Sequence, residues 1–319
     1  MSAPLTTELE RATHKTLPVR GAAISVLEHL RDGRFQRSLS VVVAATSVAS
    51  GLEVGYEHYK GSYSNPIMYT PVILSGILAV AGAGAVCTRR AATVFLRVVS
   101  AVSLVDGVIG LGFHIRGIAR KPGGWRLPVT NIVMGPPIFA PLLFGTSAYL
   151  GLMASYLRRE EDPPESGSQG DDGAGDAMPN GDWRAEINQG RFQKHLCAIT
   201  TIWAFFSGFE ALYSHYKSNF RYKAQWTPIL LTPLLMAAAV GAILNRRFAR
   251  RLLPTVSALA LADGAAGFYY HARGVVRRPG GVKKLTYNIL YGPPVFAPLL
   301  FAACGFLGLL ASLLRREGK

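Results

Sequence analysis

The stretch VSLVDGVIGLGFHIRG, residues 102–117, is apolar for most of its length but carries an aspartate at position 106 and a histidine at position 114. A second stretch, LALADGAAGFYYHARG at residues 259–274, has the same arrangement. Ionisable side chains are costly next to lipid and usually mark functional positions. Two apolar runs with the same polar residues in the same places therefore indicate a repeated membrane unit with a shared site.

Eight apolar runs are long enough to cross a bilayer, which takes about 20 residues in a helix. They lie at residues 38–57, 68–88, 94–115, 136–157, 195–214, 226–245, 252–272 and 293–314. Hydrophobic residues make up 50% of the chain and charged residues 17%. Runs of this length predict helices rather than the roughly 10-residue alternating strands of a membrane barrel. We expect an all-α polytopic membrane protein with eight transmembrane helices.

A shift of 157 positions aligns the sequence with itself without a gap. GRFQ occurs at residues 33 and 190, and NIVMGPPIFAPLLF at residue 131 recurs as NILYGPPVFAPLLF at residue 288. Self-similarity at a fixed spacing indicates duplication. Each unit would hold four spans, an even number, so both copies enter the membrane from the same side. The sequence predicts two parallel-topology four-helix repeats.

The expected organisation has four parts. Acidic and basic residues are spread through residues 1–32, which is not typical of a secretory signal. We expect these residues to form an N-terminal amphipathic segment at the membrane interface. The first repeat covers 33–159 and the second covers 190–319, with an acidic linker at 160–189. The linker is rich in glycine and proline, a composition typical of disorder.

The net charge of +15 is concentrated beside the apolar runs, in arginine pairs such as those at 89–90 and 246–247. Such pairs bind lipid phosphates, so the expected partner is the bilayer and no nucleic acid partner is expected. The face with both termini and the linker has 21 lysines and arginines, and the opposite face has 13. This difference predicts cytoplasmic termini and an external site face. The three cysteines indicate neither disulfides nor a thiolate metal site.

Comparison of the repeats singles out four ionisable residues in each. Most acidic residues inside the membrane units belong to repeat pairs, and so do four of the seven histidines. The quartets are Glu53, His58, Asp106 and His114 in the first repeat, and Glu210, His215, Asp263 and His271 in the second. Imidazole and carboxylate ligands together suit iron, manganese or zinc. We predict a metal site in each repeat near one membrane face, with iron favoured.

Helix geometry allows a second form of this site. Asp106 and His114 are eight residues apart, or about 12 Å along a helix, so they cannot bind one ion unless the helix bends. The two histidines of each repeat would then face each other as axial ligands of haem b. Arg116 and Arg273 would bind its propionates. Four glycines would either admit a flat cofactor or simply allow close helix packing. They are Gly107, Gly110, Gly264 and Gly267.

These features predict a redox protein, and if it is an enzyme, a membrane-bound metal-dependent oxidoreductase with a redox protein or a quinone as partner. Two alternatives remain. One is a transporter or channel whose carboxylates relay protons or cations. The other is a structural subunit in which pairs such as Glu53 with His114 fix the helix register.

Two further expectations concern the surroundings of the quartets. Tyr56 and Tyr213, which occupy matching positions, could be hydrogen-bond partners of the site, but we expect them in the aromatic belt at the membrane interface. Pro141 and Pro298 are expected one turn inside the fourth span, where each would kink the helix.

Overall fold

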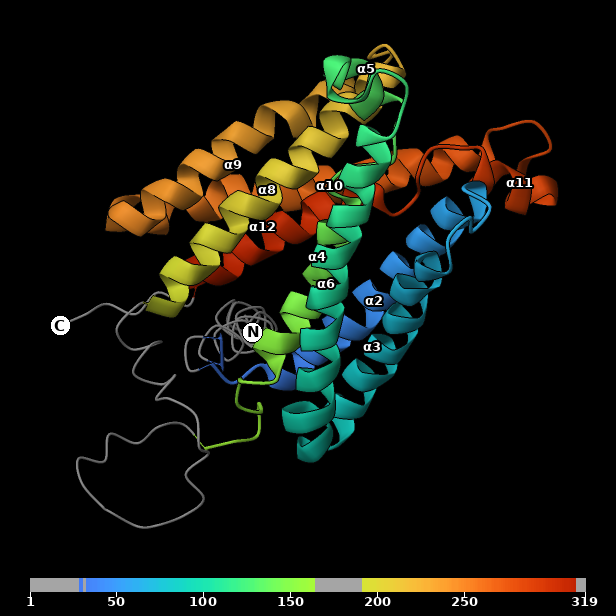
Figure 1. The fold of residues 1–319 in the computed structure, drawn as a ribbon. Coiled ribbons are helices and arrows are strands. Elements are labelled where there is room, and N and C mark those ends of the chain that lie inside the picture. The colour runs from blue at the N-terminus through green and yellow to red at the C-terminus, as the bar shows by residue number, and fades with distance from the viewer. Residues whose placement is uncertain (1–28, 31–32, 164–190, 314–319) are drawn as a thin grey trace, which may run out of the picture.

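The computed structural model describes residues 29–30, 33–163 and 191–313, and this part of the chain is helical with no β-strand (Figure 1). The predicted interfacial segment and the predicted linker lie almost wholly outside the described residues. The first half contains α2 (Gln36–Lys60), η1 (Pro66–Tyr69), α3 (Thr70–Cys87), η2 (Ala91–Leu96), α4 (Arg97–Ala119), η3 (Gly124–Arg126), α5 (Pro128–Val133) and α6 (Ala140–Ala154).

The second half has the same order of elements. It contains α8 (Arg191–Lys217), η4 (Lys223–Trp226), α9 (Thr227–Leu244), η5 (Phe248–Leu252), α10 (Leu253–Val276), η6 (Gly281–Lys284), α11 (Leu285–Leu290) and α12 (Ala297–Leu313). The bounds of α3 and α9 differ by 157 residues at both ends, and so do those of α5 and α11. In both halves a short π-helix, η2 or η5, leads directly into the third long helix.

Six helical segments of the described chain are long and apolar enough to cross a membrane, which supports an integral membrane protein. They are Gln36–Lys60, Pro66–Cys87, Ala91–Ala119, Phe192–Lys217, Lys223–Leu244 and Phe248–Val276. The remaining two apolar helices are shorter, with 15 residues in α6 and 17 in α12. At 1.5 Å per residue they reach only about 22–26 Å, against a hydrocarbon core of about 30 Å. The expectation of eight spanning helices is therefore not confirmed.

The prolines before α6 explain why the fourth helix is short. Proline has no amide hydrogen and disfavours a helical conformation in the residue before it. Pro136 and Pro137 lie in a non-helical segment, and α6 begins only at Ala140. Pro141 then occupies the first turn, where a missing N–H costs nothing. The expected kink at Pro141 is wrong for this reason, and Pro298 has the corresponding position at the start of α12.

The two halves are packed into one core. Within the first half α6 packs against α2 and α4, and within the second α12 packs against α8 and α10. The buried apolar cluster joins residues from both halves, including Leu39, Leu150, Leu196 and Leu307. Figure 1 shows that α5 lies near the end of α8 and that α11 lies near the end of α2, and these pairs are in contact. Each half therefore sends the segment before its short helix to the other half.

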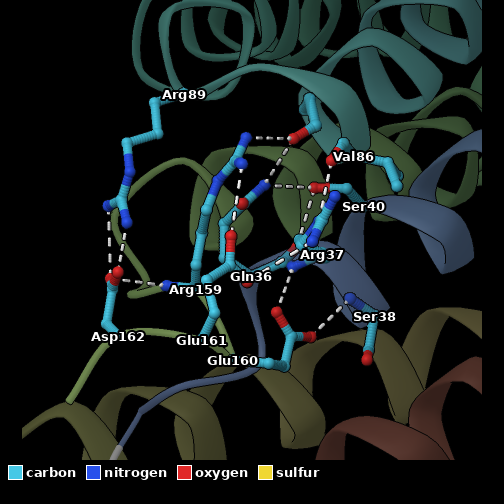
Figure 2. A network of polar contacts seen from close by, with 11 residues as sticks. Gln36, Arg37, Ser38, Ser40, Val86, Arg89, Arg159, Glu160, Glu161 and Asp162 are labelled. Carbon is cyan, nitrogen blue, oxygen red and sulfur yellow. Dashed lines mark hydrogen bonds and ion pairs between the residues drawn. The ribbon is translucent and has the colours of Figure 1, made fainter.

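A polar network joins the start of α2 to the end of α3 and to the residues after α6 (Figure 2). The Glu160 carboxylate accepts hydrogen bonds from the backbone amides of Arg37 (3.1 Å) and Ser38 (2.8 Å). The Arg37 Nε donates to the Val86 carbonyl at 2.8 Å. The helix dipole favours an anion at the start of a helix and a cation at its end. The network thus stabilises the start of α2 and the end of α3.

Acidification is expected to loosen this network at Asp162. The guanidinium of Arg89 lies beside Asp162 and holds the pKa of that carboxyl below its ordinary value of 3.8. A carboxyl whose pKa is lower in the folded state stabilises it above the ordinary pKa, and this contribution disappears as the pH falls through the lowered pKa. The Arg89 side chain is 62% exposed, so the effect is less than about 1 kcal/mol.

Hydrogen exchange at Arg159, whose amide donates to Asp162 at 3.0 Å, measures this loosening. After correction for intrinsic rates, protection should fall as the pH drops below 3.8. The substitution Asp162→Asn should remove the pH dependence. A pH response of equal size in that variant would assign the loosening to another group.

Candidate functional site

Two pairs of histidines lie at matching places in the two halves. His58 is near the end of α2, and His114 is on α4. In the second half the ring centroids of His215, on α8, and His271, on α10, are 6.5 Å apart with an angle of 75° between the ring planes. The structure therefore brings together the two imidazoles of the second quartet, and it places His58 and His114 at the matching positions of α2 and α4.

All four histidines are oriented through Nδ1 by a backbone carbonyl. The acceptors are the carbonyl oxygens of Met68 for His58 (2.6 Å), Pro137 for His114 (2.5 Å), Gln225 for His215 (3.0 Å) and Pro294 for His271. A carbonyl oxygen can only accept, so Nδ1 must carry the proton. The lone pair of a neutral ring then lies on Nε2, and none of the four Nε2 atoms has a hydrogen-bond partner among the described residues. This is the orientation found for histidines that bind metals.

The loop after each first long helix has an unusual backbone. Ser62 and Tyr63 have positive φ angles of 59° and 44°, and Asn219 and Phe220 have 55° and 47°. Consecutive non-glycine residues seldom adopt this left-handed conformation, and for a bulky residue it is a clear outlier. The conformation places an aromatic ring beside a histidine, with centroids of Tyr63 and His58 6.1 Å apart. Strain of this kind is concentrated at functional sites.

Replacing Ser62 with glycine is expected to stabilise the protein, because glycine adopts positive φ without a steric penalty. The gain should be about 1 kcal/mol, the usual cost of this conformation for a residue with a side chain. Thermal unfolding in detergent measures it. The control is Ser64→Gly, since Ser64 does not have a positive φ, and there the change should be zero or destabilising. Equal stabilisation by both substitutions would show that the positive φ of Ser62 is not the cause of the gain.

Each glutamate of the quartets accepts a hydrogen bond from a backbone amide of the opposite half. Glu53 on α2 accepts a hydrogen bond from the Phe296 amide at 3.0 Å, just before α12. Glu210 on α8 accepts one from the Phe139 amide at 2.6 Å, just before α6. Both carboxylates lie at the N-terminus of a short helix, where the helix dipole favours negative charge. Each half thus supplies the anion for the short helix of the other.

Each glutamate also accepts a hydrogen bond from a tyrosine one turn along its own helix. Tyr56 Oη donates to Glu53 at 2.6 Å, and Tyr213 Oη donates to Glu210. The alternative that these tyrosines are hydrogen-bond partners is therefore confirmed. They are three residues from their partners, a spacing that places side chains on the same helix face. In each half the glutamate carboxylate therefore accepts hydrogen bonds from a tyrosine of its own helix and from a backbone amide of the other half.

The two aspartates have a third kind of environment. Asp106 Oδ1 accepts a hydrogen bond from the Thr70 hydroxyl at 2.6 Å, and Asp263 Oδ1 accepts one from Thr227. Thr70 and Thr227 are the first residues of α3 and α9, so the aspartates of α4 and α10 fix the position of the preceding helix. The threonines were missed in the sequence, although both repeats have them at matching positions.

The predicted four-ligand metal site does not form. Over residues 29–30, 33–163 and 191–313, no group of three or more His, Cys, Asp or Glu side chains could hold a metal ion. The carboxylates are directed to other partners, Glu53 and Glu210 to the opposite half and Asp106 and Asp263 to threonines. The predicted register-fixing pair of Glu53 with His114 is also wrong, because each residue has a different partner. What remains of each quartet is a pair of imidazoles.

The four glycines expected at a flat cofactor contact prolines instead. A Cβ atom on Gly107 would lie 2.8 Å from the Pro141 carbonyl oxygen, and one on Gly110 would lie 2.9 Å from Pro141 Cβ. Gly264 and Gly267 meet Pro298 in the same way. The glycines allow α4 and α10 to approach the short helices closely, so the helix-packing interpretation is correct for them.

The basic loop after each second histidine is held in place by an asparagine. Asn131 on α5 is buried and donates to the carbonyls of Pro122 (3.1 Å) and Gly124 (2.7 Å), and Asn288 has the same role in the second half. Arg116 and Arg273, two residues after the histidines, are exposed at the surface of α4 and α10. Their guanidinium groups are therefore accessible at the ends of α4 and α10.

No family model matches this sequence, and no curated protein and no solved structure matches it.

Proposed function

We propose that this integral membrane protein is a redox protein that holds one haem b in each half, with His58 and His114 as ligands in the first half and His215 and His271 in the second. The observation that supports it most is the orientation of the four imidazoles. Each donates Nδ1–H to a backbone carbonyl, which leaves Nε2 available for a metal.

The residues present fit haem better than a metal bound by protein alone. A porphyrin supplies four nitrogen ligands, so two histidines complete the coordination, and a larger ligand cluster is not needed. His215 and His271, whose ring centroids lie 6.5 Å apart, would hold the iron in the second half, and His58 and His114 would hold it in the first. Arg116 and Arg273 would pair with propionates.

When bound, haem supplies one-electron redox chemistry that no amino-acid side chain of the site provides. The protein's own part is to hold the imidazoles and to bind the propionates. The aromatic rings of Tyr63 and Phe220 lie beside His58 and His215 and would exclude water from one edge of each site.

A reduced-minus-oxidised visible spectrum of the purified full chain tests the proposal. We expect a sharp Soret and α-band difference and two haems per chain by haem extraction. A featureless spectrum with no extractable haem would overturn it, and elemental analysis would then show whether the protein binds another metal.

A second function is favoured by a different observation. Broken helices whose N-termini face a binding site near mid-membrane are typical of secondary transporters. Here α6 and α12 begin at non-helical GPP segments and face Glu210 and Glu53. A proton or cation transporter predicts ion flux in proteoliposomes that Glu53→Gln and Glu210→Gln abolish. Absence of flux in a haem-loaded preparation would reject this function.

A further inference from the structure

A groove of about 370 Å³ runs between α3 and α4 on the surface of the first half, and the mechanism proposed above does not use it. Its walls are apolar, and its single ionisable residue is Asp106. The lining residues are Thr70, Ile73, Leu74, Val102, Val105, Asp106 and Ile109. Thr70 and Asp106 form its polar part, and Ile73, Leu74, Val102 and Val105 lie deeper along the two antiparallel helices.

Asp106 has unused capacity to accept hydrogen bonds. Its Oδ1 accepts from Thr70 at 2.6 Å, and Oδ2 has no partner among the described residues. The side chain is half-buried and opens onto apolar walls. A carboxylate in such surroundings is costly unless a donor approaches it. The groove therefore fits a ligand with a hydrogen-bond donor on an apolar body.

The lining also offers no partner to a phosphate group. None of the seven lining residues is basic, so a phospholipid phosphate would have no cation to bind and would meet a carboxylate. An uncharged head with a hydroxyl donor suits the site, because a hydroxyl bonded to a carboxylate is a strong, charge-assisted contact. The volume lies within the range of small-molecule sites, about 300–1,000 Å³.

We propose that this groove binds a membrane quinol, with a ring hydroxyl donating to Asp106 and the isoprenoid tail along Ile73, Val102 and Val105. The choice of a quinol among hydroxyl-bearing lipids rests on the proposed redox function. Asp106 lies eight residues before His114 on α4, about 12 Å along the helix, so one helix carries both the quinol contact and a proposed haem ligand.

Binding of decylubiquinol to the detergent-solubilised full chain, measured by equilibrium dialysis under reducing conditions, tests the proposal. Asp106→Asn removes the charge but keeps the shape, and should weaken binding about tenfold, the loss expected for a charge-assisted hydrogen bond. Val105→Trp should abolish binding by filling the groove while leaving Asp106 in place. The matched control is Glu57→Gln, because Glu57 pairs with Lys60 at the end of α2, outside the groove, and binding should not change.

Unchanged binding in both groove variants would overturn the assignment. Displacement of the quinol by phosphatidylethanolamine at similar concentration would also overturn it and would give the groove to phospholipid. The haem content of the wild-type protein is measured in the same preparation. Quinol binding by wild-type protein without extractable haem would reject the redox function alone, whereas no binding by haem-containing wild-type protein would reject the quinol site alone.

Discussion

Replacing Gly264 with alanine is expected to destabilise the protein by about 1–3 kcal/mol, the usual cost of overpacking a tight helix contact. A Cβ atom there would lie 2.5 Å from the Ala302 backbone nitrogen and 2.7 Å from the Pro298 carbonyl oxygen. Both are backbone atoms of α12, so the helix itself must move. With an unfolding entropy of about 2.1 cal/mol/K per residue, a loss of 2 kcal/mol lowers the Tm of a chain of 319 residues by roughly 3 °C. Thermal unfolding in detergent measures the change.

The matched control is Gly112→Ala on α4. No atom would lie within 4 Å of a Cβ at Gly112, so this glycine is as helical as Gly264 but uncrowded. Alanine is the better helix former by roughly 0.5–1 kcal/mol, and the control should leave Tm unchanged or raise it. Equal losses at the two positions would show that general loss of glycine, and not contact with α12, sets the effect.

Replacing His114 with alanine is expected to remove about half of the haem absorbance, and His271→Ala should remove the other half. A haem with one axial imidazole lost is bound far more weakly, because side-chain ligation holds the iron in place. The double variant should have no α-band at all. The measurement is the reduced-minus-oxidised spectrum, with haem counted per chain, on protein whose helical content is first confirmed by circular dichroism.

His195 provides the control for these variants. It lies near the start of α8, beside Tyr149 with ring centroids 6.0 Å apart, far along the helix from His215. His195→Ala should leave the spectrum unchanged. Full absorbance in His114→Ala/His271→Ala would reject the ligand assignment even if haem is present, and a loss with His195→Ala would move the site to the opposite membrane face.

The long helices could be predicted from the sequence because hydropathy and length alone decide them. The predicted runs at 68–88 and 226–245 correspond to Pro66–Cys87 and Lys223–Leu244 in the structure. The fourth helix of each half could not be predicted in the same way. Its apolar run is long enough to cross a membrane. The helix nevertheless begins only after the two prolines, because proline disfavours a helical conformation in the residue before it and lacks an amide hydrogen.

Contacts of the candidate site that lie within one half could be predicted from the sequence. Contacts that join the two halves could not. The approach of His215 and His271 follows from two helices that carry them near one end of the bundle. The partners of Glu53 and Glu210 are amides 243 and 71 residues away in the chain, and no spacing rule reaches them. Tyr56 was within reach of sequence reasoning, because a tyrosine three residues after a glutamate lies on the same helix face.

A chain with only one of the two halves would lose the contacts that Glu53 and Glu210 make with the opposite half. Glu53 and Glu210 make the same bond in opposite directions, which is the pattern of an isologous interface, where one surface is complementary to itself. A single four-helix unit would leave its glutamate without an amide and its short helix without an anion. A second copy of the same unit would satisfy both at once, so a lone unit would meet both needs only as a symmetric homodimer.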